Sequence, residues 1–265
     1  MSKLETIELE LHESEGYAIL YLNRPNQLNA LNFQLASDFC SAITEVSKKE
    51  AIRCLIVTGK GKAFCAGGDL VEFQKAKDTT TFIANLAKKF HEGITLLKSL
   101  NAPSIAAVNG SCFGVGLSLA CACDLRACSE DAKFAVAFTS VGLSPDSSLT
   151  FHLPKIVGLS VANEMAILNR VLDANEAKQC NLVSQIIFPK ESFLEEVKKL
   201  AKKIGQGPTL AFGSTKELLI KSYYNDLDTH LEEELEHVKK NAGREDFKEG
   251  IKSFFEKRKR IFKGK

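Results

Sequence analysis

A unit made of an apolar strand, a glycine-rich turn and a helix occurs twice in this chain, and it limits the possible folds more than any other pattern. The first copy spans residues 54–75 and carries Gly67 and Gly68, and the second spans residues 104–123 and carries Gly114. Parallel strands need a crossover connection, which is usually a helix. The repeat therefore predicts an α/β fold with mainly parallel strands.

Other segments fit this architecture. Polar and apolar residues alternate over residues 7–25 on both sides of Gly16, which predicts a hairpin of two strands. Apolar residues recur at helical spacing over residues 31–46. A continuous helical pattern is expected over residues 153–168, followed by a strand over 182–187.

The chain of 265 residues can bury a large core, and no linker divides it. We expect a single domain over residues 1–265, with a spiral core over about 1–200 and a helical C-terminal region over about 201–265. That last region would cap the core or pack on a neighbouring subunit.

Composition excludes several function classes. A net charge of +2 argues against a broad basic surface for nucleic acid, and no apolar run reaches the length of a membrane span. The N-terminal segment is charged rather than apolar, and the eight cysteines show no zinc-site spacing. We expect a cytoplasmic protein with reduced thiols and no bound metal.

The two glycine-rich turns offer main-chain chemistry. A helix N-terminus leaves amide N–H groups unpaired and carries a partial positive charge. Such groups are expected near Gly67 and Gly68 in the first turn, and near Gly114, Val115 and Gly116 in the second. If both ends face one point, they form an oxyanion hole that stabilises a carbonyl oxygen as it becomes negative. The alternative is that these turns only begin helices.

Several segments together resemble the enoyl-CoA hydratase/isomerase (crotonase) family, and they run through nearly the whole chain. They are RPNQLNALN (24–32), AFCAGGDL (63–70), the stretch from APSIAAVNG to EDAKFA (102–135), LVSQII (182–187) and KEGIKSFFEKRKRIF (248–262). The resemblance implies a crotonase fold, which is a spiral of ββα turns with a C-terminal helical trimerisation region. It also implies acyl-CoA thioester substrates, no cofactor other than the CoA of the substrate, and a homotrimer or a hexamer made of two trimers.

The resemblance assigns roles to individual residues. Gly68 and Val115 would supply the two oxyanion N–H groups, although most family members carry glycine at the second position. The backbone donor survives this change if the local φ suits a β-branched residue. Phe254 and Lys257 resemble residues that reach the adenine and phosphates of CoA, in the same or a neighbouring subunit. The CoA groove would be lined by Leu28, Ala30, Ala66, Gly67, Asp69 and Leu70.

Side chains at three positions distinguish the reactions of the family. Hydratases of the family use two glutamates, but this chain has Ser118 and Phe138 at those positions, as walls of the acyl pocket. Asp146 stands where enoyl-CoA isomerases and the ring-epoxide isomerase of phenylacetyl-CoA breakdown carry a carboxylate. This favours a shift of a double bond with Asp146 as the proton shuttle. Enoyl-CoA hydratase activity is the alternative, and Asp146 could also simply cap a helix.

His91 leaves a further possibility open. It lies at the margin of a helical apolar face, where a histidine is commonly structural. Aryl-CoA dehalogenases of this family pair a histidine at this position with an aspartate at the position of Asp146, and use a tryptophan where Phe138 stands. A dehalogenase-like hydrolase and a non-catalytic acyl-CoA- or RNA-binding relative therefore remain minor alternatives.

Overall fold

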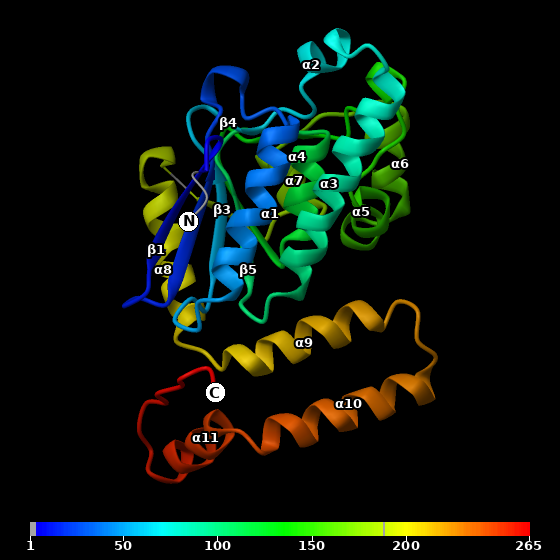
Figure 1. Cartoon of the computed structure of the whole chain (residues 1–265). Coiled ribbons are helices and arrows are strands. Elements are labelled where there is room, and N and C mark those ends of the chain that lie inside the picture. The colour runs from blue at the N-terminus through cyan, green and yellow to red at the C-terminus, as the bar shows by residue number, and fades with distance from the viewer. Residues whose placement is uncertain (1–3, 188) are drawn as a thin grey trace.

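The computed structural model describes residues 4–187 and 189–265, and its centre is a six-stranded sheet (Figure 1). The strand order is β1-β2-β3-β5-β7-β10. The strands β1 and β2 form the predicted antiparallel hairpin, and all further pairs in this sheet are parallel. The strands are β1 (Ile7–His12), β2 (Tyr17–Leu22), β3 (Leu55–Gly59), β5 (Ser104–Val108), β7 (Leu125–Ser129) and β10 (Gln185–Ile187).

A second sheet grows beside the first, one strand at a time. Its order is β4-β6-β8-β9, and β4, β6 and β8 pair in parallel. Each of these three strands follows a strand of the larger sheet within a few residues, and a helix comes next. The chain thus winds in ββα turns, as expected. The strands are β4 (Ala63–Cys65), β6 (Ser111–Phe113), β8 (Lys133–Ala135) and β9 (Leu172–Asp173).

Helices cover both faces of the larger sheet. On β2, Ala18, Leu20 and Leu22 face the main core, which contains α1 (Phe33–Ser47), α3 (Thr79–Ser99) and α4 (Val115–Ala122). The alternate residues Tyr17, Ile19 and Tyr21 face the other layer, which α8 (Phe193–Gly205) covers. Strand side chains alternate between faces, so one strand serves both layers. This is why β2, β3 and β5 are buried at every position.

The continuous helix expected over residues 153–168 is wrong. Two helices stand there, α5 (Leu149–Val157) and α6 (Leu159–Ile167), with Gly158 between them. Gly158 has a φ of 78° and a ψ of 156°, which a helix cannot contain. The remaining short elements are α2 (Leu70–Lys75), α7 (Ala174–Gln179), η1 (Pro25–Gln27), η2 (Thr139–Val141) and η3 (Lys190–Ser192).

The last part of the chain is helical, as predicted, and projects from the core. The helices α9 (Thr209–Lys221) and α10 (Leu227–Ala242) lie side by side, and α11 (Glu245–Phe255) follows (Figure 1). Lys216 ties α9 to the core, because its Nζ lies 2.8 Å from Asp124 Oδ2 and donates to the carbonyl of Leu100. Within the described residues, none of the helices has both the length and the apolar character of a membrane span.

Candidate active site

The two glycine-rich turns meet at one edge of the smaller sheet. They follow β4 and β6, which pair in parallel. The two turns therefore begin at the same edge of the sheet. At the contact, a Cβ added to Gly114 would lie 3.3 Å from the Cα of Gly67. Gly114 has a φ of 55°, and this close approach requires a residue without a side chain. The two turns that the sequence analysis singled out are therefore neighbours in the fold.

Each turn leaves an amide N–H without a protein acceptor. Within residues 4–187 and 189–265, neither Gly68 nor Val115 donates its main-chain N–H to another group. Gly68 is held in place by its neighbours, since Leu31 donates to the carbonyl of Gly67 (2.8 Å) and accepts from the amide of Asp69 (2.9 Å). Val115 is the first residue of α4 and has no positive φ, so its branched side chain leaves the donor intact.

Gly68 and Val115 both line one cavity of about 420 Å³. The walls come from the two turns, from α2 and α3, and from the loop that follows β8. Among the described residues that line it, Asp146 is the single one with an ionisable side chain. The large apolar side chains in the wall are Leu31, Leu70, Phe73, Ile83, Leu86, Val115, Phe138, Val141 and Leu143. An apolar cavity with two amide donors and one acid suits a carbonyl compound with an apolar chain.

The carboxylate of Asp146 contacts two side chains. His91 on α3 places its Nε2 2.8 Å from Asp146 Oδ1, and the Ser147 hydroxyl donates to Oδ2 at 3.2 Å. The side chains of Asp146 and His91 are 40% and 50% exposed, so solvent reaches this pair. The N-cap of α5 is Ser148, with no side-chain capping bond, and Asp146 contributes only its main-chain carbonyl to Leu149. The capping alternative for the Asp146 carboxylate is therefore wrong.

Ser118 and Phe138 have different surroundings. Phe138 lines the cavity, as the sequence predicts for a pocket residue. Ser118 is fully buried and lies outside the cavity wall, because its hydroxyl turns away to donate to the main-chain oxygen of Asp146 at 2.9 Å. The prediction that Ser118 lines the acyl pocket is corrected by this contact.

The residues expected along the CoA groove divide into two groups. Ala66, Gly67 and Leu70 line the cavity itself. Leu28 and Ala30 lie on the adjoining segment, which is joined to the first turn where the Ala66 amide donates to the Leu28 carbonyl at 3.1 Å. Neither of these two lines the cavity.

Asp69 has a structural task rather than an open binding surface. Its carboxylate is mostly buried, caps α2 by accepting from the Glu72 amide at 3.3 Å, and pairs with Arg24 at 2.9 Å. Arg24 also donates to the carbonyl of Ala30, so it joins both segments of the expected groove. Sequence reasoning did not single out Arg24, although a buried aspartate in a glycine-rich turn calls for a cation nearby.

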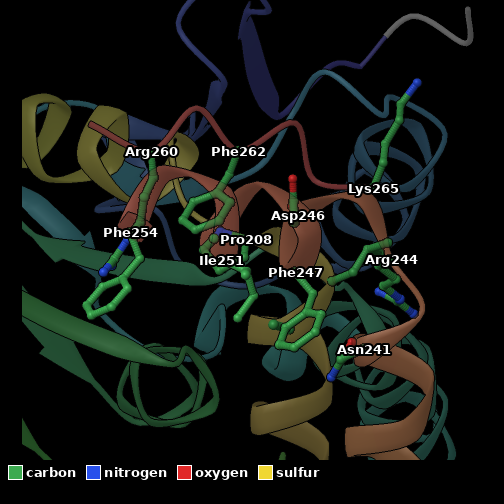
Figure 2. Close-up of a pocket in the computed structure, with 13 residues that line it drawn as sticks. Pro208, Asn241, Arg244, Asp246, Phe247, Ile251, Phe254, Arg260, Phe262 and Lys265 are labelled. Carbon is green, nitrogen blue, oxygen red and sulfur yellow. The ribbon is translucent and has the colours of Figure 1, made fainter. Parts of the chain in front are cut away.

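Phe254 and Lys257 lie away from this cavity within one chain. Phe254 lies on α11 and is exposed. Together with Ile251 and Phe262 it lines a separate pocket of the C-terminal region (Figure 2). Lys257 follows the end of that helix and lines neither pocket. Neither residue lines the cavity of its own chain.

The winding in ββα turns is the architecture that the resemblance in the sequence implies. The family profile described as enoyl-CoA hydratase/isomerase matches residues 12–265. The chain belongs to this family, and the resemblance seen in its sequence is confirmed.

Relatives in the family carry names that denote different reactions. The chain is 32% identical to 1,2-epoxyphenylacetyl-CoA isomerase of Escherichia coli strain K12, over 96% of this chain and 97% of the relative. It is 30% identical to 4-chlorobenzoyl coenzyme A dehalogenase-2 of an Arthrobacter species, over 98% and 95% of the two chains. It superimposes on the crystal structure of enoyl-CoA hydratase from Bacillus anthracis with a TM-score of 0.92 and 29% identity, covering 98% and 100%. Family membership thus defines a CoA thioester enzyme and leaves its reaction to the site.

Proposed function

We propose that this protein is an isomerase that converts a 3-enoyl-CoA into a 2-enoyl-CoA, with Asp146 as the proton shuttle. One observation carries the proposal: Asp146 supplies the single ionisable side chain among the described residues of a cavity that Gly68 and Val115 also line, and the amides of these two residues have no acceptor among the described residues. A shift of a double bond needs one group that accepts and returns a proton.

The reaction balances with these groups alone. The Asp146 carboxylate removes a proton from C2 of the 3-enoyl thioester, and the electron pair of that C–H bond moves onto the thioester oxygen as a dienolate. The amides of Gly68 and Val115 donate to this oxygen and stabilise its negative charge. The protonated Asp146 then returns the proton to C4, and the double bond comes to lie between C2 and C3.

Hydration is less well supported by the residues present. Two carboxylates would have to place a water molecule, but Phe138 is apolar and the Ser118 hydroxyl is committed to the main chain of Asp146. In this proposal, the relative named as an isomerase is the better guide to the reaction than the one named as a hydratase.

The test is a purified-protein assay with trans-3-hexenoyl-CoA, following the 2-enoyl thioester by ultraviolet absorbance. We expect Asp146→Asn to lower kcat by about 10²–10⁴, the usual contribution of a general acid–base group. Asp228→Asn, which changes an exposed aspartate on α10, is the matched control and should keep full activity. Undiminished isomerisation by Asp146→Asn, or hydration of crotonyl-CoA as fast as isomerisation, would contradict the proposal.

The His91–Asp146 contact favours one second candidate, a hydrolytic aryl-CoA dehalogenase. In that reaction the aspartate attacks the ring carbon and displaces halide, and the histidine activates the water that hydrolyses the ester. The relative named as a dehalogenase supports this reading, while Phe138 and the absence of tryptophan from the sequence speak against it. Release of chloride from 4-chlorobenzoyl-CoA, measured with an ion electrode, would establish it.

We further propose that the protein assembles as a homotrimer or a hexamer through its C-terminal helices. Exposed apolar side chains gather there, more than a monomer needs to leave uncovered. Assembly would also allow Phe254 and Lys257 to reach the CoA of a neighbouring subunit. Light scattering during size-exclusion chromatography tests the order of assembly, and a monomer would refute it. The exposed apolar residues are Leu219, Tyr223, Tyr224, Leu227, Leu231, Leu235, Val238, Phe247, Ile251, Phe254 and Phe255.

A further inference from the structure

We propose that Ser118 is the positioning residue of Asp146, fixing the main chain of the acid against the helix that supplies an oxyanion amide. The inference rests on the proposed isomerase function and adds a residue to its machinery. It concerns a serine that touches neither the cavity nor the carboxylate, so its effect would be transmitted through the backbone.

Ser118 connects two parts of the site that are far apart in sequence. It lies on α4, three residues after Val115, and is completely buried. Its hydroxyl oxygen is 2.9 Å from the main-chain oxygen of Asp146 and 3.4 Å from that of Gly114. A hydroxyl has one proton to donate, and the Gly114 carbonyl already accepts from the Ser118 amide at 3.1 Å. The hydroxyl proton therefore belongs to Asp146.

The loop that carries Asp146 depends on such an anchor. Ser147 and Ser148 follow with φ values of 55° and 67°, in the left-handed region that non-glycine residues adopt rarely. Conformations of this kind persist where the surrounding contacts hold them in place. The Asp146 carbonyl has two such contacts, the Ser118 hydroxyl and the Leu149 amide at 3.2 Å. Without the Ser118 hydroxyl, the Asp146 carbonyl keeps only the hydrogen bond from the Leu149 amide among these two contacts.

The carboxylate itself is weakly held, so the backbone decides where it lies. It is 40% exposed, and among residues 4–187 and 189–265 its hydrogen-bond partners are the side chains of His91 and Ser147 alone. For proton transfer the acyl C2 must lie between this carboxylate and the amides of Gly68 and Val115. Ser118 is one helical turn from Val115 on α4. Its hydrogen bond therefore fixes the main chain of Asp146 relative to the helix that carries the Val115 amide. A misplacement of about 1 Å can cost about 100-fold in rate.

The same contact explains why position 118 suits a serine. A glutamate there, as the family resemblance leads one to expect in hydratases, would bring an acceptor-only carboxylate against the Asp146 carbonyl, which is also an acceptor. The serine at position 118 and the acid at position 146 thus depend on each other, because the Ser118 hydroxyl holds the loop that carries Asp146.

The experiment compares Ser118→Ala with Ser129→Ala in the trans-3-hexenoyl-CoA assay. Ser129 is an equally buried serine on β7, and its hydroxyl donates to Asp131 at 2.7 Å, away from the cavity. We expect Ser118→Ala to lower kcat by about 10- to 100-fold with KM changed less than about threefold, since C2 and the acid lose alignment while binding is kept. Ser129→Ala should keep kcat, with a similar change in melting temperature.

Two further variants separate positioning from general damage. Ser118→Cys keeps a weak donor and should recover part of kcat. Ser118→Ala added to Asp146→Asn should cause no further loss, because the serine acts only through the acid. A kcat of Ser118→Ala equal to that of Ser129→Ala, or a full additional loss in the double variant, would overturn the inference while leaving the isomerase proposal standing.

A crystal structure of Ser118→Ala decides the question without turnover. We expect the main chain of residues 143–148 to shift relative to α4. An unchanged loop refutes the positioning role, whatever the reaction of the enzyme proves to be. Failure of the wild-type protein to isomerise any 3-enoyl-CoA, together with a shifted loop, would refute the proposed function and retain the structural role of Ser118.

Discussion

Replacing Gly114 by alanine tests whether the two turns have to touch for the enzyme to work. Gly114 has φ 55° and ψ −124°, a conformation that an L-residue adopts only under strain. Strain of this kind costs about 1–3 kcal/mol. The new Cβ would also lie 3.3 Å from the Cα of Gly67, closer than the ~3.5–4.0 Å of a relaxed carbon contact. The turns must therefore separate by a few tenths of an ångström.

Two effects follow from this separation. With ΔΔG near 2 kcal/mol, the melting temperature should fall by about 4–8 °C, at about 2–4 °C for each kcal/mol in a chain of this size. In addition, the separation would move the amides of Gly68 and Val115 apart, so that in the proposed mechanism they could no longer bind one oxygen together. Loss of one oxyanion donor lowers kcat by about 10²–10³, and we expect a decrease of that order.

Gly158→Ala is the control for backbone strain alone. Gly158 also has a conformation suited to glycine, with φ 78° and ψ 156°, but nothing lies within 4 Å of the position of its Cβ. It joins α5 to α6 and does not line the cavity. Thermal unfolding and isomerase kinetics are measured on both variants. Both should lose stability, and only Gly114→Ala should lose kcat.

The reasoning fails if Gly114→Ala unfolds at a lower temperature yet turns over substrate as fast as Gly158→Ala. Such a result would mean that the contact between the turns is structural and that the two amides do not act on one reacting oxygen. An increase in KM at constant kcat would also contradict it, because the donors would then act equally on bound substrate and transition state.

Three further predictions concern stability. Arg24→Met leaves the carboxylate of Asp69 buried without its cation, so the free energy of unfolding in urea should fall by about 3–5 kcal/mol. Burial lowers the pKa of His152 to about 4. Between the ordinary pKa of histidine and this value, His152 is protonated in the unfolded chain and neutral in the folded one. Stability should therefore decrease by about 3 kcal/mol as the pH falls from about 6.5 to about 4, and His152→Gln should flatten this part of the curve. Burial alone would raise the pKa of Asp124, but the charges of Lys216 and Lys98 outweigh it and lower this pKa overall. The Asp124 carboxylate therefore stabilises the fold at neutral pH, and this stabilisation is lost as the pH falls through the lowered pKa. Lys216→Met should move acid unfolding, followed by circular dichroism, to higher pH.

The sequence was sufficient for features that depend on local patterns. Alternation predicted the hairpin before Asn23, and the two glycine-rich turns indicated where main-chain donors would lie. The break at Gly158 was missed, because apolar spacing continues through it while the backbone does not. The spacing of apolar side chains indicates which face of a helix is buried. It does not reveal a single residue whose φ interrupts the helix.

Contacts between distant segments could not be read from the sequence. His91 and Asp146 are 55 residues apart, and only the packing of α3 against the loop after β8 brings them within 2.8 Å. The direction of the Ser118 hydroxyl was equally hidden, since a serine inside a helix ordinarily bonds to the preceding turn. Its actual partner exists because the loop returns over α4.

The division between main chain and side chain explains which parts of this site can vary. In the proposed mechanism the oxyanion donors are main-chain amides, so a valine at position 115 can serve as well as a glycine because it is the first residue of α4 and has no positive φ. The acid, in contrast, is a side chain on a loop, and its place depends on contacts such as the one from Ser118. In this proposal the reaction at the site therefore depends on the loop that holds Asp146 more than on the identity of the side chains at the two turns.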